Sequence, residues 1–225
     1  MRTCVRLSID VEPSIAGNFV NKFLNPLIHE PVWGSVNGKS EALGFINNVL
    51  NEFGLKASFF IETAHVRYFS DRPMRNYVDF LAEHGHDIQL HLHCNWLNFD
   101  HERNASWPCI SDRCCDLHVE RLTQVIREGA DRIKTWCGTA PSTFRAGSFA
   151  TEASVFQALK AAEFKQSSTV CVAVHKPADR SLWLASGAVK IGSVKEYPVT
   201  CFQDVGPIGR GCLRPMQITS CSFSE

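Results

Sequence analysis

The 225-residue sequence has no excess charge of either sign, because 23 Lys and Arg residues balance 23 Asp and Glu residues. Proteins that bind nucleic acid through its phosphates usually carry a basic surplus, so we expect no nucleic-acid partner. The sequence also has no apolar run near the roughly 20 residues of a membrane span, and its first ten residues lack the apolar core of a signal peptide. These absences predict a soluble, cytoplasmic protein without a membrane span.

Several motifs of common enzyme and metal-binding classes are also missing. There is no Gly-x-Ser-x-Gly nucleophile elbow, and the glycine-rich segment 206–211 lacks the lysine of a phosphate-binding loop. The ten cysteines occur without an export signal, which favours reduced thiols over disulfides. Three of the cysteines lie near His101 and His118 but lack Cys-x2-Cys spacing, so a structural zinc site there is the weaker alternative. These cysteines are Cys109, Cys114 and Cys115.

Apolar patterning predicts alternating strands and helices. Hydrophobic residues make up 44% of the chain, enough to bury the core of a single domain over residues 1–225. Strands alternating with helices imply an α/β fold with a parallel sheet. The segment 18–38 is rich in glycine, proline and aromatic residues and is interpreted as a long loop. Strands are expected over 3–9, 56–62, 87–91, 141–145, 165–169, 189–191 and 195–199, and helices over 40–53, 73–83, 117–136 and 151–162.

The first cluster of polar residues follows the first predicted strand. Asp10 and Glu12 are two residues apart, so an extended backbone directs both carboxylates to the same side. Two like charges this close are costly unless they share a cation or a proton. The pair could therefore combine a metal ligand with a general base, although a solvated pair at the end of a strand remains the alternative.

The second cluster is rich in histidine and ends another predicted strand. Alternation from residue 88 onward places His91 and His93 on one face, so that two imidazoles project together as ligands of a first-row metal. The alternative is that each histidine is an isolated hydrogen-bonded residue, and we apply that interpretation to His84. Arg145 follows a later strand, where its guanidinium could orient a carboxylate base or form an ordinary surface ion pair.

In a parallel sheet these clusters would meet beyond the carboxyl ends of the strands. One carboxylate and two imidazoles make a three-ligand site that keeps positions open for water. A second carboxylate can then accept the proton of that water. The combination predicts a metal-dependent hydrolase.

Four motifs occur in an order that resembles the polysaccharide deacetylases of the NodB-homology type. They are Leu-Ser-Ile-Asp-Val-Glu (7–12), Lys-Ala-Ser-Phe-Phe-Ile-Glu (56–62), His-Gly-His-Asp-Ile-Gln-Leu-His (84–91) and Phe-Arg-Ala-Gly-Ser-Phe (144–149). The resemblance extends over residues 5–200. It implies a distorted (β/α) barrel of about seven parallel strands. It also implies a hydrolase of linear amide bonds in carbohydrate metabolism, which removes N-acetyl groups from an amino sugar or polysaccharide precursor.

The resemblance also implies roles for individual residues. Asp10 matches the catalytic base, and Glu12 stands where an Asp of the family binds the metal. His91 matches the first histidine of a His-x3-His motif, whereas the second falls on Asn95. His93 is the substitute that strand geometry favours, and the Asn95 oxygen is the alternative ligand. Arg145 corresponds to the arginine that orients the base.

The implied mechanism is attack by metal-bound water, with zinc as the first choice of metal and Asp10 accepting the proton. The family's general-acid histidine lies in a C-terminal Leu-x-His motif, but the last histidine here is His175. The chain is therefore expected to lack the last strand and helix of the domain.

The predicted substrate is a carbohydrate that carries an N-acetylated amino sugar, with Trp96 and Trp183 as candidate binding residues because aromatic rings stack on pyranose rings. Two other functions stay open at this point. One is a catalytically impaired homologue that only binds glycans. The other is a hydrolase of a small cyclic amide or ureide.

Overall fold

A computed structural model describes residues 5–99, 110–204 and 211–218. It consists of two compact units, the first formed by Met1–Ser111 with Glu128–Pro141 and the second by Asp112–Arg127 with Ser142–Glu225. Within the described ranges, no helix is long and apolar enough to cross a membrane. His101 and Cys109 of the alternative zinc site lie outside the described residues. The single domain and the cytoplasmic location remain predictions.

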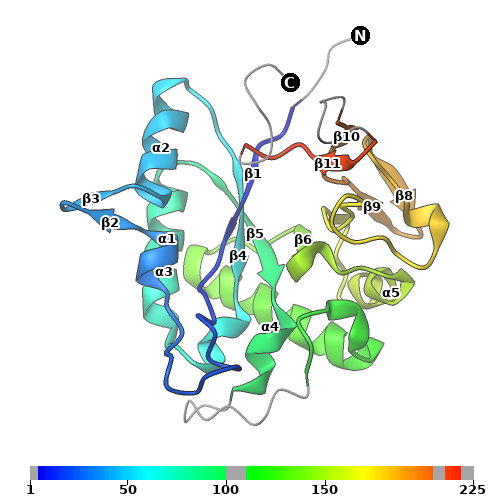
Figure 1. Ribbon diagram of the computed structural model, residues 1–225, viewed down its shortest axis with the longest axis horizontal. Helices are drawn as coiled ribbons and strands as arrows, with labels where there is room; N and C mark the ends of the chain where they lie inside the picture. The colour runs from blue at the N-terminus through cyan, green and yellow to red at the C-terminus, as the bar shows by residue number, and fades with distance from the viewer. Residues whose placement is uncertain (1–4, 100–109, 205–210, 219–225) are drawn as a thin grey trace. The chain divides into compact units, whose positions relative to one another are not determined.

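The first unit is built on three parallel strands in the order β1-β4-β5. The middle strand, β4, is buried over Phe59, Phe60 and Ile61, as in parallel sheets that are covered on both faces. Because the strands are parallel, their carboxyl ends lie at the same edge (Figure 1). The strands are β1 (Ser8–Val11), β4 (Ser58–Glu62) and β5 (Asp87–Leu92).

The helices of the first unit connect these strands (Figure 1). Helix α2 ends at Glu52, and Gly54 follows its C-cap with a φ of +63°, which suits a glycine just past the end of a helix. The ring of Trp33 stacks on Tyr77 and meets Phe80 edge-on, which packs the segment before α2 against α3. The elements are α1 (His29–Val32), β2 (Ser35–Val36), β3 (Lys39–Ser40), α2 (Leu43–Glu52), η1 (Ala64–Arg67), α3 (Asp71–Glu83) and η2 (Cys94–Asn98).

Helix α4 (Val119–Cys137) contributes residues to both units. In the first unit, Gly129 lets the helix approach β5 and the residue after β4 closely. A Cβ atom at this position would lie 2.6 Å from Thr63 Oγ1 and 2.8 Å from Leu90 Cδ1. The close packing of this part of α4 therefore depends on glycine at position 129.

The second unit contains three parallel strands, β6, β7 and β9, and β8, which pairs with β9 in the antiparallel direction. A separate hairpin-like pair, β10 and β11, follows. The elements are η3 (Cys114–Asp116), β6 (Thr143–Ala146), η4 (Gly147–Phe149), α5 (Ala153–Ala161), β7 (Gln166–Ser167), η5 (Arg180–Leu182), β8 (Val189–Ile191), β9 (Val194–Glu196), β10 (Cys201–Gln203) and β11 (Leu213–Pro215).

The α/β architecture with mostly parallel strands is confirmed. The first strand was expected to end at residue 9 but continues to Val11, so Asp10 lies within it. The helix expected from residue 40 begins at Leu43, because Ser40 pairs in β3 while its Oγ accepts a hydrogen bond from Gly44 N. The interpretation of 18–38 as one loop is wrong in part, since α1 and β2 form there. Closure of the strands into a barrel remains a prediction.

Candidate metal centre

The candidate centre lies at the carboxyl ends of β1 and β5, the two neighbours of β4. Glu12 directly follows β1, His91 is the fifth residue of β5, and His93 comes just after that strand. The backbone of His93 remains extended, with φ −100° and ψ 110°. Alternation therefore continues past the end of the strand, and both imidazoles project in the same direction.

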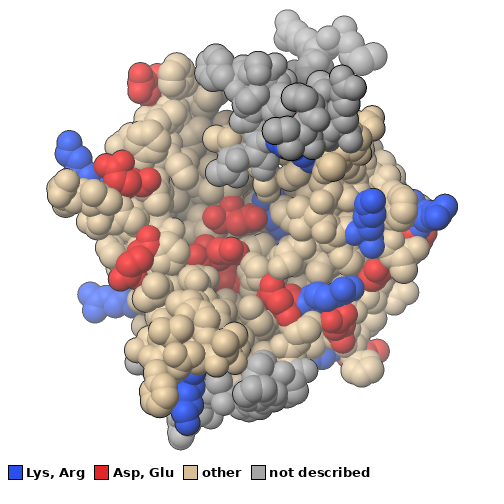
Figure 2. Space-filling view, viewed as in Figure 1, with Lys and Arg blue, Asp and Glu red and all other residues tan. Residues whose placement is uncertain are grey.

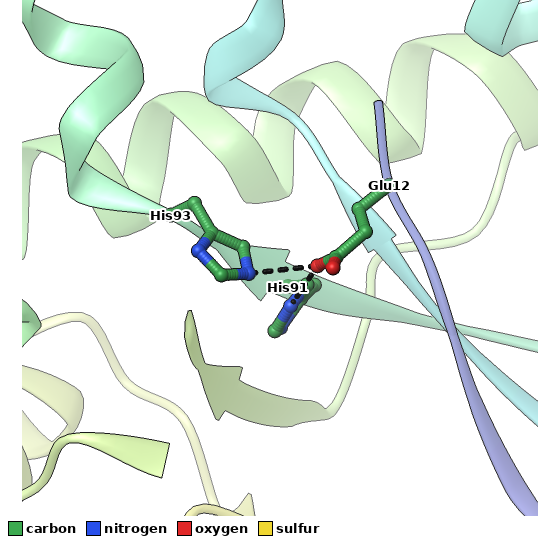
Figure 3. Close-up of side chains that lie close together, drawn as sticks. All are labelled: Glu12, His91 and His93. Atoms are coloured by element: carbon green, nitrogen blue, oxygen red, sulfur yellow. Dashed lines mark hydrogen bonds and ion pairs between the residues drawn. The ribbon is translucent and has the colours of Figure 1, made fainter. Parts of the chain in front are cut away.

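The three side chains converge on one point (Figure 3). Glu12 Oε2 lies 2.9 Å from His91 Nε2 and 2.7 Å from His93 Nε2. The imidazole rings meet nearly perpendicularly, with centroids 4.8 Å apart. All three ligand atoms lie within 4.8 Å of one another. The spacing predicted that His91 and His93 would share a face, and the structure brings both together with Glu12.

The electrostatics of the three side chains are strongly coupled. Burial raises the pKa of Glu12, but hydrogen bonds from His91 and His93 lower it more, and the net pKa is far below the usual range. Burial lowers the pKa of His91, but the Asp10 charge and the bond to Glu12 outweigh it, and the net pKa is raised. The cluster thus favours an ionised carboxylate facing imidazole N–H donors.

The donor set suits a divalent metal ion. Two imidazole nitrogens and one carboxylate oxygen are ligands that zinc and related first-row metals accept. The nitrogens that face Glu12 are the Nε2 atoms of both histidines, so an ion could replace the shared protons without a change of side-chain direction. The residues present therefore fit the group that the sequence predicts.

Asp10 lies in β1, two residues before Glu12 and on the same face of the strand. Its negative charge is one of the causes that raise the pKa of His91, so the carboxylate lies close enough to act on the cluster. Its assignment as the base remains a prediction.

Glu62 was missed as a functional residue. It ends β4, pairs in register with His91 and is fully buried. One carboxylate oxygen accepts a hydrogen bond from the backbone N–H of Ala64 at 2.5 Å, and the other accepts one from the N–H of His93. Burial raises the pKa of Glu62 to about 7, although the neighbouring histidines lower it. An acidic residue that ends an apolar strand next to the two clusters was the available signal.

Two of the other predicted residues lie near this part of the first unit. Asn95 is in η2, and its Oδ1 is buried without a hydrogen-bond partner among the described residues. Trp96 is only 1% exposed and packs against Phe69 and Phe99, with ring centroids 5.9 and 5.6 Å away. In this structure Trp96 belongs to the core and presents no open ring face to a sugar.

Trp183 and Arg145 belong to the second unit. Trp183 is 43% exposed, and Arg180 and Lys176 lie over its ring at 5.3 and 5.6 Å. Arg145 is 3% exposed, which excludes an ordinary surface ion pair. Its Nε and Nη2 donate to the carbonyl oxygen and hydroxyl of Ser168, each at 3.0 Å. The predicted roles of Trp183 and Arg145 remain predictions.

Comparison with solved structures identifies the fold. A protein from Mycobacterium smegmatis assigned as a polysaccharide deacetylase matches 87% of this chain with a TM-score of 0.54 and 14% identity. The chain shares the fold of that deacetylase. It spans 57% of that protein's length, and the low identity means that the similarity bears on fold alone. No family model and no curated protein matches the sequence.

Two further solved structures match at lower structural similarity. The peptidoglycan deacetylase PdaC from Bacillus subtilis matches 62% of this chain and 46% of its own, with 16% identity and a TM-score of 0.35. A family 4 acetyl xylan esterase from Clostridium thermocellum, solved with a cobalt ion, matches 68% of this chain and 53% of its own, with 15% identity and a TM-score of 0.39.

Proposed function

We propose that this protein is a metal-dependent hydrolase that removes N-acetyl groups from an amino sugar in a carbohydrate. The observation that carries the proposal is the convergence of Glu12, His91 and His93 within 4.8 Å at the carboxyl edge of parallel strands. Asp10 adds a second carboxylate beside them. The fold shared with an assigned polysaccharide deacetylase supports this choice among metal-dependent hydrolases.

In this proposal Glu12, His91 and His93 hold a divalent ion, with zinc as the first choice. When bound, the ion supplies Lewis acidity that makes a water more acidic and polarises the acyl oxygen. Both histidines then bind through neutral Nε2 atoms, so the proton on His91 leaves as the ion enters. Glu12 needs no such change, because its depressed pKa already keeps it ionised.

Asp10 is the proposed general base. It accepts the proton of the attacking water while the acetamide carbon becomes tetrahedral. Its placement on the strand that leads into Glu12 ties the base to the ligand set by a rigid element. The resemblance further implies that Arg145 orients this base. We assign no residue as the proton donor to the leaving amine.

Release of acetate from N-acetylated chitooligosaccharides, measured with added zinc or cobalt, tests the proposal. We expect acetate from the unchanged protein and none above background from His91→Ala, which removes a buried ligand. The matched control is His84→Ala, since the His84 side chain bonds locally to the Phe80 carbonyl and packs on the Phe80 ring, outside the ligand set. Oligosaccharide binding without acetate release would contradict the proposal and favour a glycan-binding protein instead.

A further inference from the structure

The buried carboxylate of Glu62 connects the metal centre to the turn that follows β4. Glu62 is 0% exposed, and its carboxylate oxygens accept hydrogen bonds from the backbone amides of Ala64 and His93. Carboxylates this deeply buried are rare unless they are fully bonded. Glu62 therefore holds a defined position between two segments that the strands themselves do not connect.

The bond to His93 lies where the β4–β5 ladder stops. The last pair in register is Glu62 with His91, and β5 ends at Leu92. The paired register of the two strands ends there. The Glu62 carboxylate accepts the hydrogen bond of the His93 backbone N–H. The His93 backbone keeps the extended conformation that directs its imidazole toward Glu12.

Glu62 is itself fixed from the other side. Its second carboxylate oxygen accepts a hydrogen bond from Ala64 N at 2.5 Å. Its backbone carbonyl oxygen accepts one from Nδ1 of His65 at 2.8 Å. His65 is also fully buried, and its ring lies near the rings of Phe69 and Trp136. The carboxylate is thus anchored to the core, and a well-anchored acceptor transmits its position to the amide that it binds.

We propose that Glu62 is a positioning residue that sets the direction of the metal ligand His93 through the ligand's backbone amide. This inference rests on the proposed function, because it assumes that His93 binds a metal ion. Glu62 is not one of the three residues whose ligand atoms form the cluster. Its effect should therefore appear in metal affinity, beyond any effect on the stability of the fold.

Glu196 in the second unit provides a matched control. It is likewise 0% exposed, and its Oε1 accepts from the backbone amides of Thr169 and Val170, each at 2.9 Å. Neither of these residues is a candidate metal ligand. Glu196→Gln therefore makes the same substitution in an equally buried carboxylate outside the ligand set, although glutamine can keep both of these bonds because one oxygen accepts them.

The experiment measures the dissociation constant for zinc by titration calorimetry, and the melting temperature without metal, for the unchanged protein, Glu62→Gln and Glu196→Gln. Glutamine keeps one acceptor and turns an N–H group toward the other amide, so one of the two bonds is lost. We expect Glu62→Gln to bind zinc about 10–100-fold more weakly. Glu196→Gln should stay within about twofold of the unchanged protein, even if its melting temperature falls as much.

Equal zinc affinity in Glu62→Gln and the unchanged protein would overturn the inference while leaving the proposed function intact. Equal weakening by both variants would also overturn it, because the effect would then be general. If Glu62→Gln does not fold, Glu62→Asp decides, since its shorter carboxylate cannot reach both amides. In that variant, unchanged zinc affinity would overturn the inference. An unchanged protein that binds no divalent metal would overturn the proposed function and this inference together.

Discussion

At the scale of the residue, the candidate centre depends on where protons reside. Glu12 stays ionised because two imidazoles donate to it, and His91 holds its proton more tightly because Asp10 and Glu12 surround it with negative charge. A divalent ion satisfies the same negative charge without any proton. The cluster therefore has the electrostatic character of a cation site whether protons or a metal ion occupy it.

Asp10 provides the first prediction at this scale. Asp10→Asn keeps the size of the side chain but removes its capacity to accept a proton, so kcat for acetate release should fall by about 10²–10⁴-fold. Metal content should stay near that of the unchanged protein, because Asp10 is not among the proposed ligands. Acetate assays and elemental analysis of the same sample measure both quantities. A variant with an unchanged rate would remove Asp10 from the mechanism.

His65 provides a prediction about pH and stability. Burial lowers its pKa from 6.5 to about 4, so the folded protein keeps His65 neutral. The unfolded chain takes up the proton as the pH falls through 6.5, and the folded protein does so only near 4. His65 should therefore cost the fold up to about 3 kcal/mol as the pH falls across this window. Urea unfolding at several pH values measures the free energy of unfolding.

His65→Phe is the comparison for that measurement. Phenylalanine fits the aromatic surroundings of Phe69 and Trp136 but cannot titrate. At neutral pH the free energy of unfolding of the variant should be about 1 kcal/mol lower, because the hydrogen bond from His65 Nδ1 to the Glu62 carbonyl oxygen is lost. Its stability should then fall less steeply than that of the unchanged protein between pH 6.5 and 4. Parallel curves would contradict the account of His65.

How far the site could be predicted also differs from residue to residue. The period-two spacing of Asp10 with Glu12, and of His91 with His93, was enough to group them, because strands impose that alternation. Glu62 could not be assigned a role from spacing, since its partner His93 depends on the register between β4 and β5. Trp96 follows His93 closely, but the turn of η2 directs its ring into the core.

At the scale of the element, most helices and strands were predictable from apolar periodicity. The expected helix over 73–83 is α3 (Asp71–Glu83), and the expected strand over 87–91 is β5 (Asp87–Leu92). The short hairpin of β2 and β3 was not predictable, because two-residue strands are too short to show a periodic pattern. The antiparallel direction of β8 likewise depends on its partner and not on its own sequence.

Gly129 allows a prediction about element packing. Gly129→Ala favours the helical state of α4 by up to about 1 kcal/mol, but its Cβ would meet Thr63 Oγ1 at 2.6 Å and Leu90 Cδ1 at 2.8 Å. Overpacking of this kind costs about 1–3 kcal/mol, so the net effect should be a loss of stability. Chemical denaturation measures the change.

Lys134→Ala, at an exposed position of the same helix, is the control for Gly129→Ala. It should change the free energy of unfolding by less than about 0.5 kcal/mol. A Gly129→Ala variant that is more stable than the unchanged protein would show that α4 does not depend on close approach at this position.

At the scale of the whole molecule, the chain forms two compact units, and the three proposed ligands all lie in the first. On the face drawn in Figure 2, Lys and Arg side chains are interspersed with Asp and Glu and do not gather in one patch. This agrees with the zero net charge of the sequence. The alternation of strands and helices predicted the α/β class, whereas the division into two units depends on contacts that no local pattern shows.

The central claim is that Glu12, His91 and His93 form a binding site for one divalent ion. Zinc titration of the unchanged protein, His91→Ala and His84→Ala at neutral pH tests it most directly. We predict one zinc ion per chain for the unchanged protein and for His84→Ala. Substitution of a residue that only supports a ligand typically weakens metal binding by about 10–100-fold. His91→Ala removes a ligand, so its zinc affinity should fall by more than that. No binding by the unchanged protein, or equal affinity in His91→Ala, would contradict the claim.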